Sequence, residues 1–460
     1  MRGRVVSGFL VLFTVASTAV GVFACGELKE APDADAGPDA GQGPLDGDAP
    51  DGKTTPSDGG TDGAPLDPDV VKVPVGTTTI AGSLSIAADE TGDVSLAWLD
   101  TPSAQRHLHI ARIAGNEDPP RIIVPSDTPL ESNAVSVGQA VSTFSTSKGC
   151  FGVVWGQAGS LRVAAIGADA KPGTSSVFAT VTVGAIPRLS QVRTAPTTSS
   201  EVLVVWSDVA RYGADLGGAV RAGTLGFAGC VPGTATLDTQ PFGTTDVPYQ
   251  APPAGAPEVA VTRVLGSFHA AFQKPTTPTI LGVDRRTRTG GAFSAASEVD
   301  DGGTVTAGGS VGIAANGADV MVAYYRRTSD TVGDLVVKTL DAAGATKGET
   351  VLEQSVLIGM AAATYLEAAR LAMVTTPKGA VIAAAFARDA LTSELRIYRA
   401  DATAPGGFRS LLLDTNVFGP KGGGDAHPLV DIAADGAGRV HVAWRSGSGA
   451  RNLTYARLPP

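Results

Sequence analysis

Short runs of alternating apolar and polar residues recur along the chain from about residue 84, separated by turns rich in glycine and aspartate. The clearest pair lies near the two ends. Ile86-Ala87-Ala88-Asp89 leads through Gly92 to residues 94–98, and Ile432-Ala433-Ala434-Asp435 leads through Gly438 to residues 440–444, offset by 346 at every position. A period of two residues interrupted by an Asp/Gly turn predicts a β-hairpin. The chain therefore carries a repeated hairpin.

Seven aromatic residues close the second strand of such hairpins, and all four tryptophans of the chain are among them. They are Trp98, Trp155, Trp206, Phe272, Tyr324, Phe386 and Trp444, spaced 57, 51, 66, 52, 62 and 58 residues apart. Because their strands also carry Val, Leu or Ala at alternate positions, we expect the rings to be core wedges between repeats, and not platforms for a ligand.

A third alternating run follows the aromatic, and a fourth, looser run follows the third. Third strands are predicted at 161–163, 220–222, 280–282, 335–337 and 395–397, and fourth strands at 121–124, 349–352 and 409–412. Four short strands per unit of about 58 residues is the pattern of a β-propeller blade. Seven such units fill residues 70–460, which predicts an all-β, seven-bladed propeller of four-stranded antiparallel blades.

The last unit ends at Pro460 without a fourth strand of its own, whereas residues 70–75 look like the fourth strand at 121–125. We therefore expect this N-terminal strand to complete the last blade, close the ring and cover its exposed edge. A pair of β-sandwiches is the alternative fold, but it does not predict seven matched aromatics.

The units resemble the blades of sialidase-like and related bacterial propellers, in which the second strand often reads Gly-x-Val-x-Val-Ala-Trp. The resemblance covers about 390 residues and concerns the fold. The sialidase Asp-box, Ser-x-Asp-x-Gly-x-x-Trp/Phe, is absent from every unit, and the family's arginine triad with its Tyr–Glu pair cannot be assembled from matched positions. The resemblance implies a propeller without the family's catalytic set.

The first 24 residues have the pattern of a secretory signal: Arg2 and Arg4 precede an apolar run that ends at Ala24. Residues 22–25, Val-Phe-Ala-Cys, resemble the lipobox of bacterial lipoproteins, although Phe23 is bulkier than usual. The resemblance implies that Cys25 is acylated, anchors the chain in a membrane and, with Gly26 following, goes to the outer membrane. A single transmembrane helix is the alternative.

Residues 25–69 are rich in Asp, Gly, Pro and Ala and predict a disordered tether. Residues 26–70 hold 12 acids and two lysines, a net charge of −10 that equals the charge of the whole chain. The remaining domain is nearly neutral, so it offers no basic surface for nucleic acid.

Chemically active motifs are few. Gly308-Gly309-Ser310-Val311-Gly312 matches a nucleophile elbow, but it runs into a strand and a turn at Asn316-Gly317, which favours a loop leading into an inner strand. The five histidines, His107, His109, His269, His427 and His441, show no ligand spacing, so we expect no metal and no cofactor. Cys150 opens a second strand and Cys230 follows a third strand one unit later, which makes a disulfide between them a further expectation.

The residues just after the second strands would lie on the face where propellers usually bind ligands. Cations follow in units four to seven and acids in units one and three; the set is Lys274, Arg326, Arg327, Arg388, Arg445, Asp100 and Asp208. Such a lopsided face would suit an anionic sugar or an acidic loop of a partner. The alternative is a rim of unrelated charges partnered by acids such as Asp330 or Asp389.

The sequence therefore predicts a monomeric, lipid-anchored propeller of the cell envelope that binds a protein or a glycan. A glycosidase-like or lyase-like envelope enzyme that uses the propeller funnel is the runner-up, and a purely structural component is the third possibility. Fold alone does not decide among them.

Overall fold

In the computed structural model the chain is described over eighteen segments. They are residues 71–77, 83–100, 107–129, 141–157, 160–180, 188–209, 218–238, 243–244, 258–277, 280–291, 293–300, 307–329, 331–358, 369–389, 391–415, 417, 429–446 and 452–460. The expected signal peptide, Cys25 and the tether lie outside these segments. Within them the regular structure is β-strand, apart from two single 3-10 turns, η1 (Ala228–Cys230) and η2 (Pro405–Gly407).

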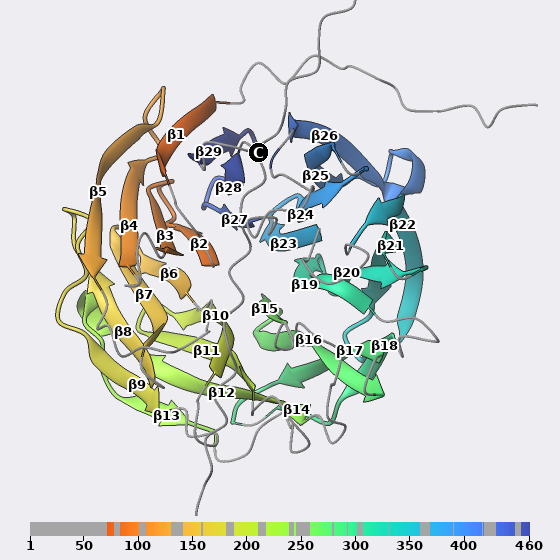
Figure 1. Cartoon of the computed structure of the whole chain (residues 1–460). Helices are drawn as coiled ribbons and strands as arrows, with labels where there is room; N and C mark the ends of the chain where they lie inside the picture. Colours follow the sequence, from red (N-terminus) through yellow and green to blue (C-terminus); the bar gives the residue numbers. More distant parts are fainter. Residues whose placement is uncertain are drawn as a thin grey trace, which may run out of the picture. The chain divides into compact units, whose positions relative to one another are not determined.

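The strands form repeated units of four, in which each strand pairs antiparallel with the next (Figure 1). The first strands are β2 (Ser83–Ala88), β6 (Val141–Ser147), β10 (Arg188–Thr198), β15 (Val259–Val264), β19 (Ala307–Asn316), β23 (Ala369–Thr376) and β27 (Val430–Ala434). The second strands are β3 (Val94–Asp100), β7 (Cys150–Gln157), β11 (Glu201–Val209), β16 (Ser267–Thr277), β20 (Asp319–Arg327), β24 (Gly379–Ala387) and β28 (Val440–Ser446).

The third strands are β4 (His107–Ala114), β8 (Ser160–Ile166), β12 (Gly218–Gly226), β17 (Ile280–Arg288), β21 (Val332–Leu340), β25 (Ser393–Ala400) and β29 (Asn452–Leu458). The outermost strands are β5 (Arg121–Pro129), β9 (Ser176–Thr180), β13 (Ala235–Leu237), β18 (Ser297–Asp300), β22 (Thr346–Leu357), β26 (Phe408–Thr415) and β1 (Val71–Thr77). The prediction of an all-β propeller with antiparallel four-stranded blades is confirmed.

Hydrogen bonding groups the described strands into six sheets: four of four strands, one of five and one of eight. The five-stranded sheet adds β14 (Gly243–Thr244) to β12. In the eight-stranded sheet, β19–β22 and β23–β26 are joined through the pair Leu357 and Ala387. In the sheet that contains β27, the outermost strand β1 pairs antiparallel with β29, with Val71 opposite Arg457.

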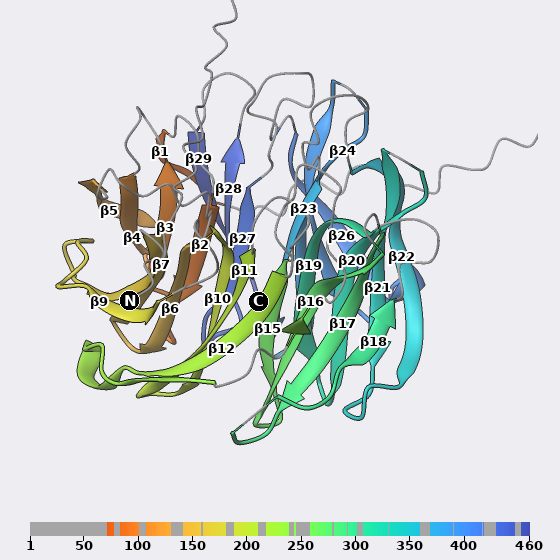
Figure 2. The same cartoon turned by 60° about the horizontal axis from the view of Figure 1, so that its bottom comes forward.

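The first strands surround the axis of the propeller, and the sheets radiate from them (Figures 1 and 2). Going round the axis, each first strand packs against the first strand of the next unit, and β27 packs against β2. The apolar core lies between neighbouring sheets, as the cluster that combines Trp444 and Val442 of β28 with Leu395 and Ile397 of β25 shows.

The seven aromatics predicted as wedges are all buried between the sheets. Their exposed fractions are 2% (Trp98), 4% (Trp155), 3% (Trp206), 2% (Phe272), 1% (Tyr324), 0% (Phe386) and 0% (Trp444). Neighbouring residues on these second strands are buried as well, as in β7 and β24, because both faces of a sheet pack against other sheets; burial thus places the rings in the core. The prediction of core wedges is confirmed.

Side chains of the first strands hydrogen bond to the backbone of the next first strand. Ser83 Oγ accepts from Val141 N at 3.1 Å, and Gln191 Oε1 accepts from Val259 N at 2.6 Å. Ser310 Oγ accepts from Leu371 N and donates to Leu371 O. These bonds satisfy amides and carbonyls that face the axis and would otherwise be buried without a partner. They also show that Ser310 is a buried link within β19, not the exposed nucleophile of an elbow.

A disulfide joins Cys150, at the start of β7, to Cys230, in η1, with Cα atoms 5.2 Å apart. It links two neighbouring sheets across 80 residues of chain. The bridge that was expected from the sequence is therefore present in the structure.

The disulfide gives a first testable prediction. The variant Cys230→Ser should lower the free energy of unfolding by about 2–4 kcal/mol, because the open chain regains loop entropy when it unfolds. Urea unfolding of the two proteins measures this difference. In the Cys25→Ser background, the unfolded and unreduced protein should show no free thiol, and two free thiols would contradict the bridge.

Candidate functional site

A small cavity lies on the axis of the propeller and is lined by residues of all seven first strands. Its volume is about 120 Å³. One half is polar and is lined by Ser85, Ser142, Thr143, Arg193, Thr194 and Asp431. The other half is lined by Ala260, Val261, Val311, Gly312, Ile313, Leu371, Ala372 and Met373. Because pockets for whole small molecules measure about 300–1,000 Å³, this cavity suits one functional group of a larger ligand.

Asp431 of β27 is the acid of the cavity, and its side chain is 13% exposed. Burial raises the pKa of this carboxyl above its ordinary value, against the opposing effect of Arg193. Asp431 Oδ2 accepts a hydrogen bond from Ile86 N of β2 at 3.0 Å. The carboxyl is thus fixed to the neighbouring strand, and its protonation is easier than that of an exposed aspartate.

Arg193 of β10 is the cation of the cavity, with a side chain that is 20% exposed. Its Nη1 atom lies 3.9 Å from Asp431 Oδ2, which is an ion-pair distance but longer than a hydrogen bond. A guanidinium has five N–H donors in a planar fork. A carboxylate that entered the cavity could therefore be held by Arg193, while its apolar neighbours contacted Val261 and Met373.

A second ion pair connects two of the first strands. Glu258 precedes β15 directly, and its Oε1 atom lies 2.7 Å from Nη1 of Arg370 in β23. Glu258 Oε2 also accepts from Val311 N of β19 at 3.3 Å. With an exposed fraction of 5%, Glu258 is held by partners on β19 and β23, and it ties the start of β15 to the eight-stranded sheet.

Two of the cations predicted for the ligand face are engaged in ion pairs. Arg326 Nη1 lies 2.7 Å from Glu349 Oε1, and Arg326 Nη2 lies 3.1 Å from Asp300 Oδ2. The hydrogen bonds that Arg326 donates to Glu349 are the main cause of its raised pKa. Positive charge at this position is therefore offset by acids of β22 and β18.

Arg388 is paired in the same way, with Glu353 at 2.7 Å and Glu394 at 3.1 Å. Burial lowers the pKa of Arg388, but these two acids outweigh burial and raise it overall. The partners of the arginines are thus not the acids considered from sequence: Asp389 accepts instead from the amides of its own turn, and Asp330 lies outside the described residues.

The other predicted residues of this face are differently placed. Arg445 is buried, with 4% exposed, and Arg327 is half-buried. Lys274, Asp100 and Asp208 lie on β16, β3 and β11, and their side chains are outside the described part of the chain. The lopsided charge predicted for this face stays a prediction, and Arg445 is not an exposed member of it.

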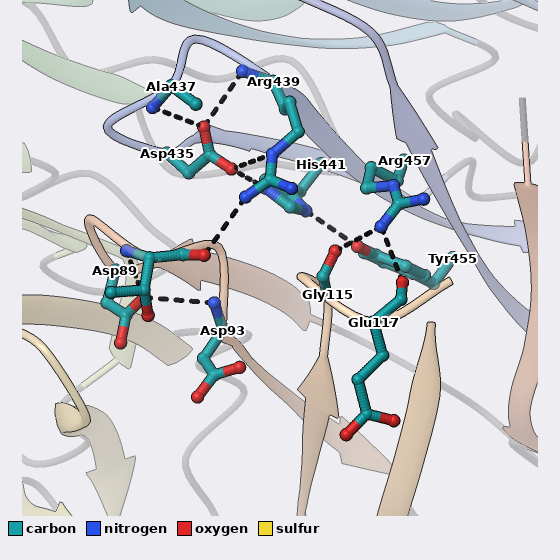
Figure 3. Close-up of polar contacts among 11 residues, drawn as sticks. Asp89, Asp93, Gly115, Glu117, Asp435, Ala437, Arg439, His441, Tyr455 and Arg457 are labelled. Atoms are coloured by element: carbon teal, nitrogen blue, oxygen red, sulfur yellow. Dashed lines mark hydrogen bonds and ion pairs between the residues drawn. The ribbon is translucent and has the colours of Figure 1, made fainter. Parts of the chain in front are cut away.

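A buried polar network lies between the first and last sheets in sequence (Figure 3). His441 Nε2 donates to Asp435 Oδ2 at 3.2 Å, and its Nδ1 atom lies 2.7 Å from Tyr455 Oη in a second hydrogen bond. Arg439 Nε donates to Asp435 Oδ2 at 2.6 Å, and Arg439 Nη2 donates to Thr91 O at 3.1 Å.

Arg457 of β29 extends this network across the same junction. Its Nη1 atom donates to the carbonyls of Gly115 and Glu117, each at 2.7 Å, in the turn between β4 and β5 (Figure 3). Asp435, His441 and Tyr455 resemble a catalytic relay in composition, but the side chains of Asp435 and His441 are 0% exposed and Tyr455 is buried. A substrate could not reach them, so the network serves to hold the two sheets together.

The same turn chemistry recurs in the matching repeat. Asp89 Oδ1 accepts from the amides of Thr91 and Asp93, as Asp435 Oδ1 accepts from those of Ala437 and Arg439. Gly92 has φ +92° in the first turn, a left-handed conformation that glycine adopts without strain. The repeated Asp/Gly pair read from the sequence is therefore a structural turn.

Asp435 gives a prediction about acid stability. Burial by itself raises the pKa of Asp435, but hydrogen bonds from His441 and Arg439 outweigh it and lower the pKa to about 2. A carboxyl whose pKa falls on folding adds stability above its unfolded value of about 3.9 and loses it as the pH falls toward the folded value. We expect Asp435→Asn to remove about 2 kcal/mol of stability at pH 7 and almost none near pH 2.

Melting temperatures measured between pH 7 and pH 2 test this expectation. The matched control is Glu298→Gln, which removes an exposed carboxylate from β18. A difference between Asp435→Asn and wild type that stayed constant over the whole pH range would contradict the role given to this carboxyl.

One group of possible metal ligands was missed by the sequence analysis. His107 and His109 alternate on β4, and Asp127 of β5 lies directly opposite His109. The signal was present as a His-x-His pair on a predicted strand, because alternate residues of a strand share a face. The sequence does not show which residue of the next strand lies opposite, and so the carboxylate was not found.

Two other histidines do not belong to this group. His427 is outside the described residues, and His269 accepts from Arg285 Nη2 at 2.9 Å.

No protein-family model matches the sequence, and no curated protein matches it. Solved structures do match, and they include sialidase and neuraminidase-like β-propellers. A protein of unknown function from Dyadobacter fermentans is 11% identical, with a TM-score of 0.46 over 85% of this chain and 99% of its own. AofleA from Arthrobotrys oligospora is 10% identical, with a TM-score of 0.41 over 75% and 90%. The sialidase of Trypanosoma rangeli is 8% identical, with a TM-score of 0.42 over 85% and 60%.

Proposed function

We propose that this chain is a lipid-anchored, seven-bladed β-propeller of the cell envelope that binds a glycan or protein partner. The observation that carries the binding role is the half-polar cavity on the axis, in which Arg193 lies 3.9 Å from its acid and retains donors for a ligand. An acidic group of the partner would enter this cavity, and the rest of the partner would lie outside it.

The count of seven blades rests on the seven first strands that follow one another round the axis. It treats the eight-stranded sheet as two blades, because one residue pair joins its halves whereas full ladders run within each half. Closure by the N-terminal strand rests on the pairing of β1 with β29.

The lipid anchor rests on the sequence of residues 1–25, which ends in Ala24-Cys25. In the part of the chain that the structure describes, no helix is long and apolar enough to cross a membrane. If Cys25 carries acyl chains, Cys25→Ser should move the protein from the detergent-rich phase to the aqueous phase in detergent partitioning. Partitioning like that of wild type would mean that the N-terminal segment anchors the chain as a helix.

Binding is tested on glycan arrays and by cross-linking to envelope proteins, with Arg193→Gln as the informative variant. The substitution removes the charge and keeps a polar side chain, so we expect binding to fall by about tenfold or more, as for a lost charge-assisted hydrogen bond. The matched control Arg121→Gln removes an arginine that is 63% exposed on β5. Equal binding by both variants, with equal melting temperatures, would exclude the cavity as the site.

A glycosidase-like or lyase-like enzyme is the second candidate, because burial raises the pKa of Asp431 in the cavity. A general acid must keep its proton near the working pH, and a raised pKa favours this. The hydrogen bond from Ile86 N argues against this catalytic role, because it fixes the carboxyl to the neighbouring strand. If the protein cleaves envelope glycans, Asp431→Asn should abolish product formation and leave binding intact; if no product forms with wild type, the binding role stands alone.

A further inference from the structure

His107, His109 and Asp127 form a cluster at one end of the third and outermost strands of the sheet β2–β5. His107 and His109 stand on the same face of β4, since they are two residues apart. In the ladder between β4 and β5, Asp127 is opposite His109 and Pro129 is opposite His107. Asp127 is thus the direct cross-strand neighbour of His109 and the diagonal neighbour of His107.

The distances within the cluster are close to those of a metal site. Asp127 Oδ1 lies 2.7 Å from His107 Nδ1 and 3.9 Å from His109 Nδ1. One ligand atom of each of the three residues lies within 4.8 Å of the others. Zinc binds nitrogen and oxygen ligands at about 2.0–2.2 Å, so two ligands of one tetrahedral ion are roughly 3.4 Å apart. Small side-chain rotations would bring all three atoms to that separation.

The surroundings hold one imidazole in place and leave the carboxylate accessible. Trp98 of β3 stacks on His109, with ring centroids 5.0 Å apart and an angle of 9° between the planes. The side chains of His107 and His109 are 15% and 16% exposed, whereas Asp127 is 55% exposed. A cation can therefore approach from the side of Asp127 and meet imidazoles that are already half-buried.

We propose that His107, His109 and Asp127 bind one divalent transition-metal ion, with zinc as the preferred ion. One coordination position of this ion would stay open. Two imidazoles and a carboxylate are ligands of zinc-like ions and differ from the all-oxygen sets that calcium and magnesium prefer. Three protein ligands leave the fourth tetrahedral position to water or to an oxygen of a ligand. The alternative role of the cluster is a His107–Asp127 hydrogen bond that needs no ion.

The cluster lies at the end of β4 that faces the connection from the second strand, where the open coordination position could meet a ligand. β4 begins directly after residues 101–106, which connect the second strand of this sheet to the third. Connections of that kind are expected from the sequence to lie on the ligand face. A metal ion held here would present a Lewis-acidic site to a carboxylate or hydroxyl of whatever that face contacts. This inference does not depend on the axial cavity.

Zinc binding to the full mature chain tests the proposal directly. Metal-free protein is titrated with Zn²⁺ against a chromophoric chelator, and bound metal is counted after equilibrium dialysis. We expect one zinc per chain, and at least about tenfold weaker binding in His107→Gln, His109→Gln and Asp127→Asn. In the double variant His107→Gln/His109→Gln, zinc should no longer bind in a one-to-one ratio.

The control is Glu117→Gln, which removes an exposed carboxylate at the opposite end of the same two strands and should leave zinc affinity unchanged. Because Asp127 is largely exposed, Asp127→Asn should fold even if a histidine variant does not. Co²⁺ replaces Zn²⁺ in a second measurement, since its visible absorption reports nitrogen and oxygen coordination. Equal zinc binding by wild type and the double variant, or no binding by wild type, would overturn the proposal.

Discussion

Replacing Trp444 by alanine should destabilise the propeller by about 3–5 kcal/mol, the usual cost of removing a large buried aromatic. Trp444 is 0% exposed and belongs to the cluster that packs β28 against residues of β24 and β25. Its Nε1 atom also donates to Asp414 Oδ2 at 2.7 Å. Since a typical domain has about 5–15 kcal/mol of total stability, this one change should lower the melting temperature markedly. Denaturant unfolding followed by tryptophan fluorescence measures it.

Phenylalanine variants separate packing from hydrogen bonding. Trp444→Phe keeps most of the ring but loses the bond to Asp414, a bond to a charged group that contributes about 1.5–3 kcal/mol. Trp98 occupies the same position of the first repeat, and its Nε1 atom has no hydrogen-bond partner among the described residues. Trp98→Phe should therefore cost less than Trp444→Phe. Alanine variants of both residues that melted like wild type would show that these rings face solvent or a ligand.

The sequence predicted the blades because each blade depends on local information. Alternation within a strand, an Asp/Gly turn and an aromatic at the end of the second strand all lie within about 15 residues, and each has a direct physical cause. The matched segments around Trp98 and Trp444 show this most clearly, since even the capping aspartates Asp89 and Asp435 have the same role.

The candidate sites were harder to predict because they depend on which residues of different strands meet. Arg326 is paired with Glu349, from another strand of its own sheet, and with Asp300, from β18 of the neighbouring sheet. The offset between strands depends on bulges such as the one between Gly333 and Leu335, and a sequence pattern does not reveal these. For the same reason, the sequence did not show that Asp127 lies next to His107 and His109.

The cavity on the axis was not predictable for a related reason. Arg193 and Asp431 are 238 positions apart in the sequence and meet because β10 and β27 both line the axial cavity. Neither residue stands in a recognisable motif. Both occupy ordinary polar positions of their strands, Arg193 after Val192 and Asp431 between Val430 and Ile432, so their place in the cavity is known only when the positions of all the first strands are known.

Deleting residues 70–75 should cost the protein several kcal/mol and expose a sheet edge. Six positions of β1 are paired with β29, and the deletion removes four of them, Val71 to Pro74; each backbone hydrogen bond of such a ladder contributes about 0.5–1.5 kcal/mol. Pro74 lacks an N–H, which an outermost strand tolerates because only one of its sides is paired. After the deletion β29 becomes the edge of its sheet, so we expect self-association as well as a lower melting temperature.

Deletion of residues 26–60 is the matched control, because it removes a longer piece of the chain before the first described strand and leaves β1 in place. The control protein should melt like wild type and stay monomeric in size-exclusion chromatography, whereas the protein without 70–75 should melt earlier and elute as larger species. A ring that is complete without β1 would give equal melting temperatures for the two deletions. That result would assign closure to the packing of β27 against β2 and to the side-chain bonds across the same junction, such as those of Arg439 and Arg457.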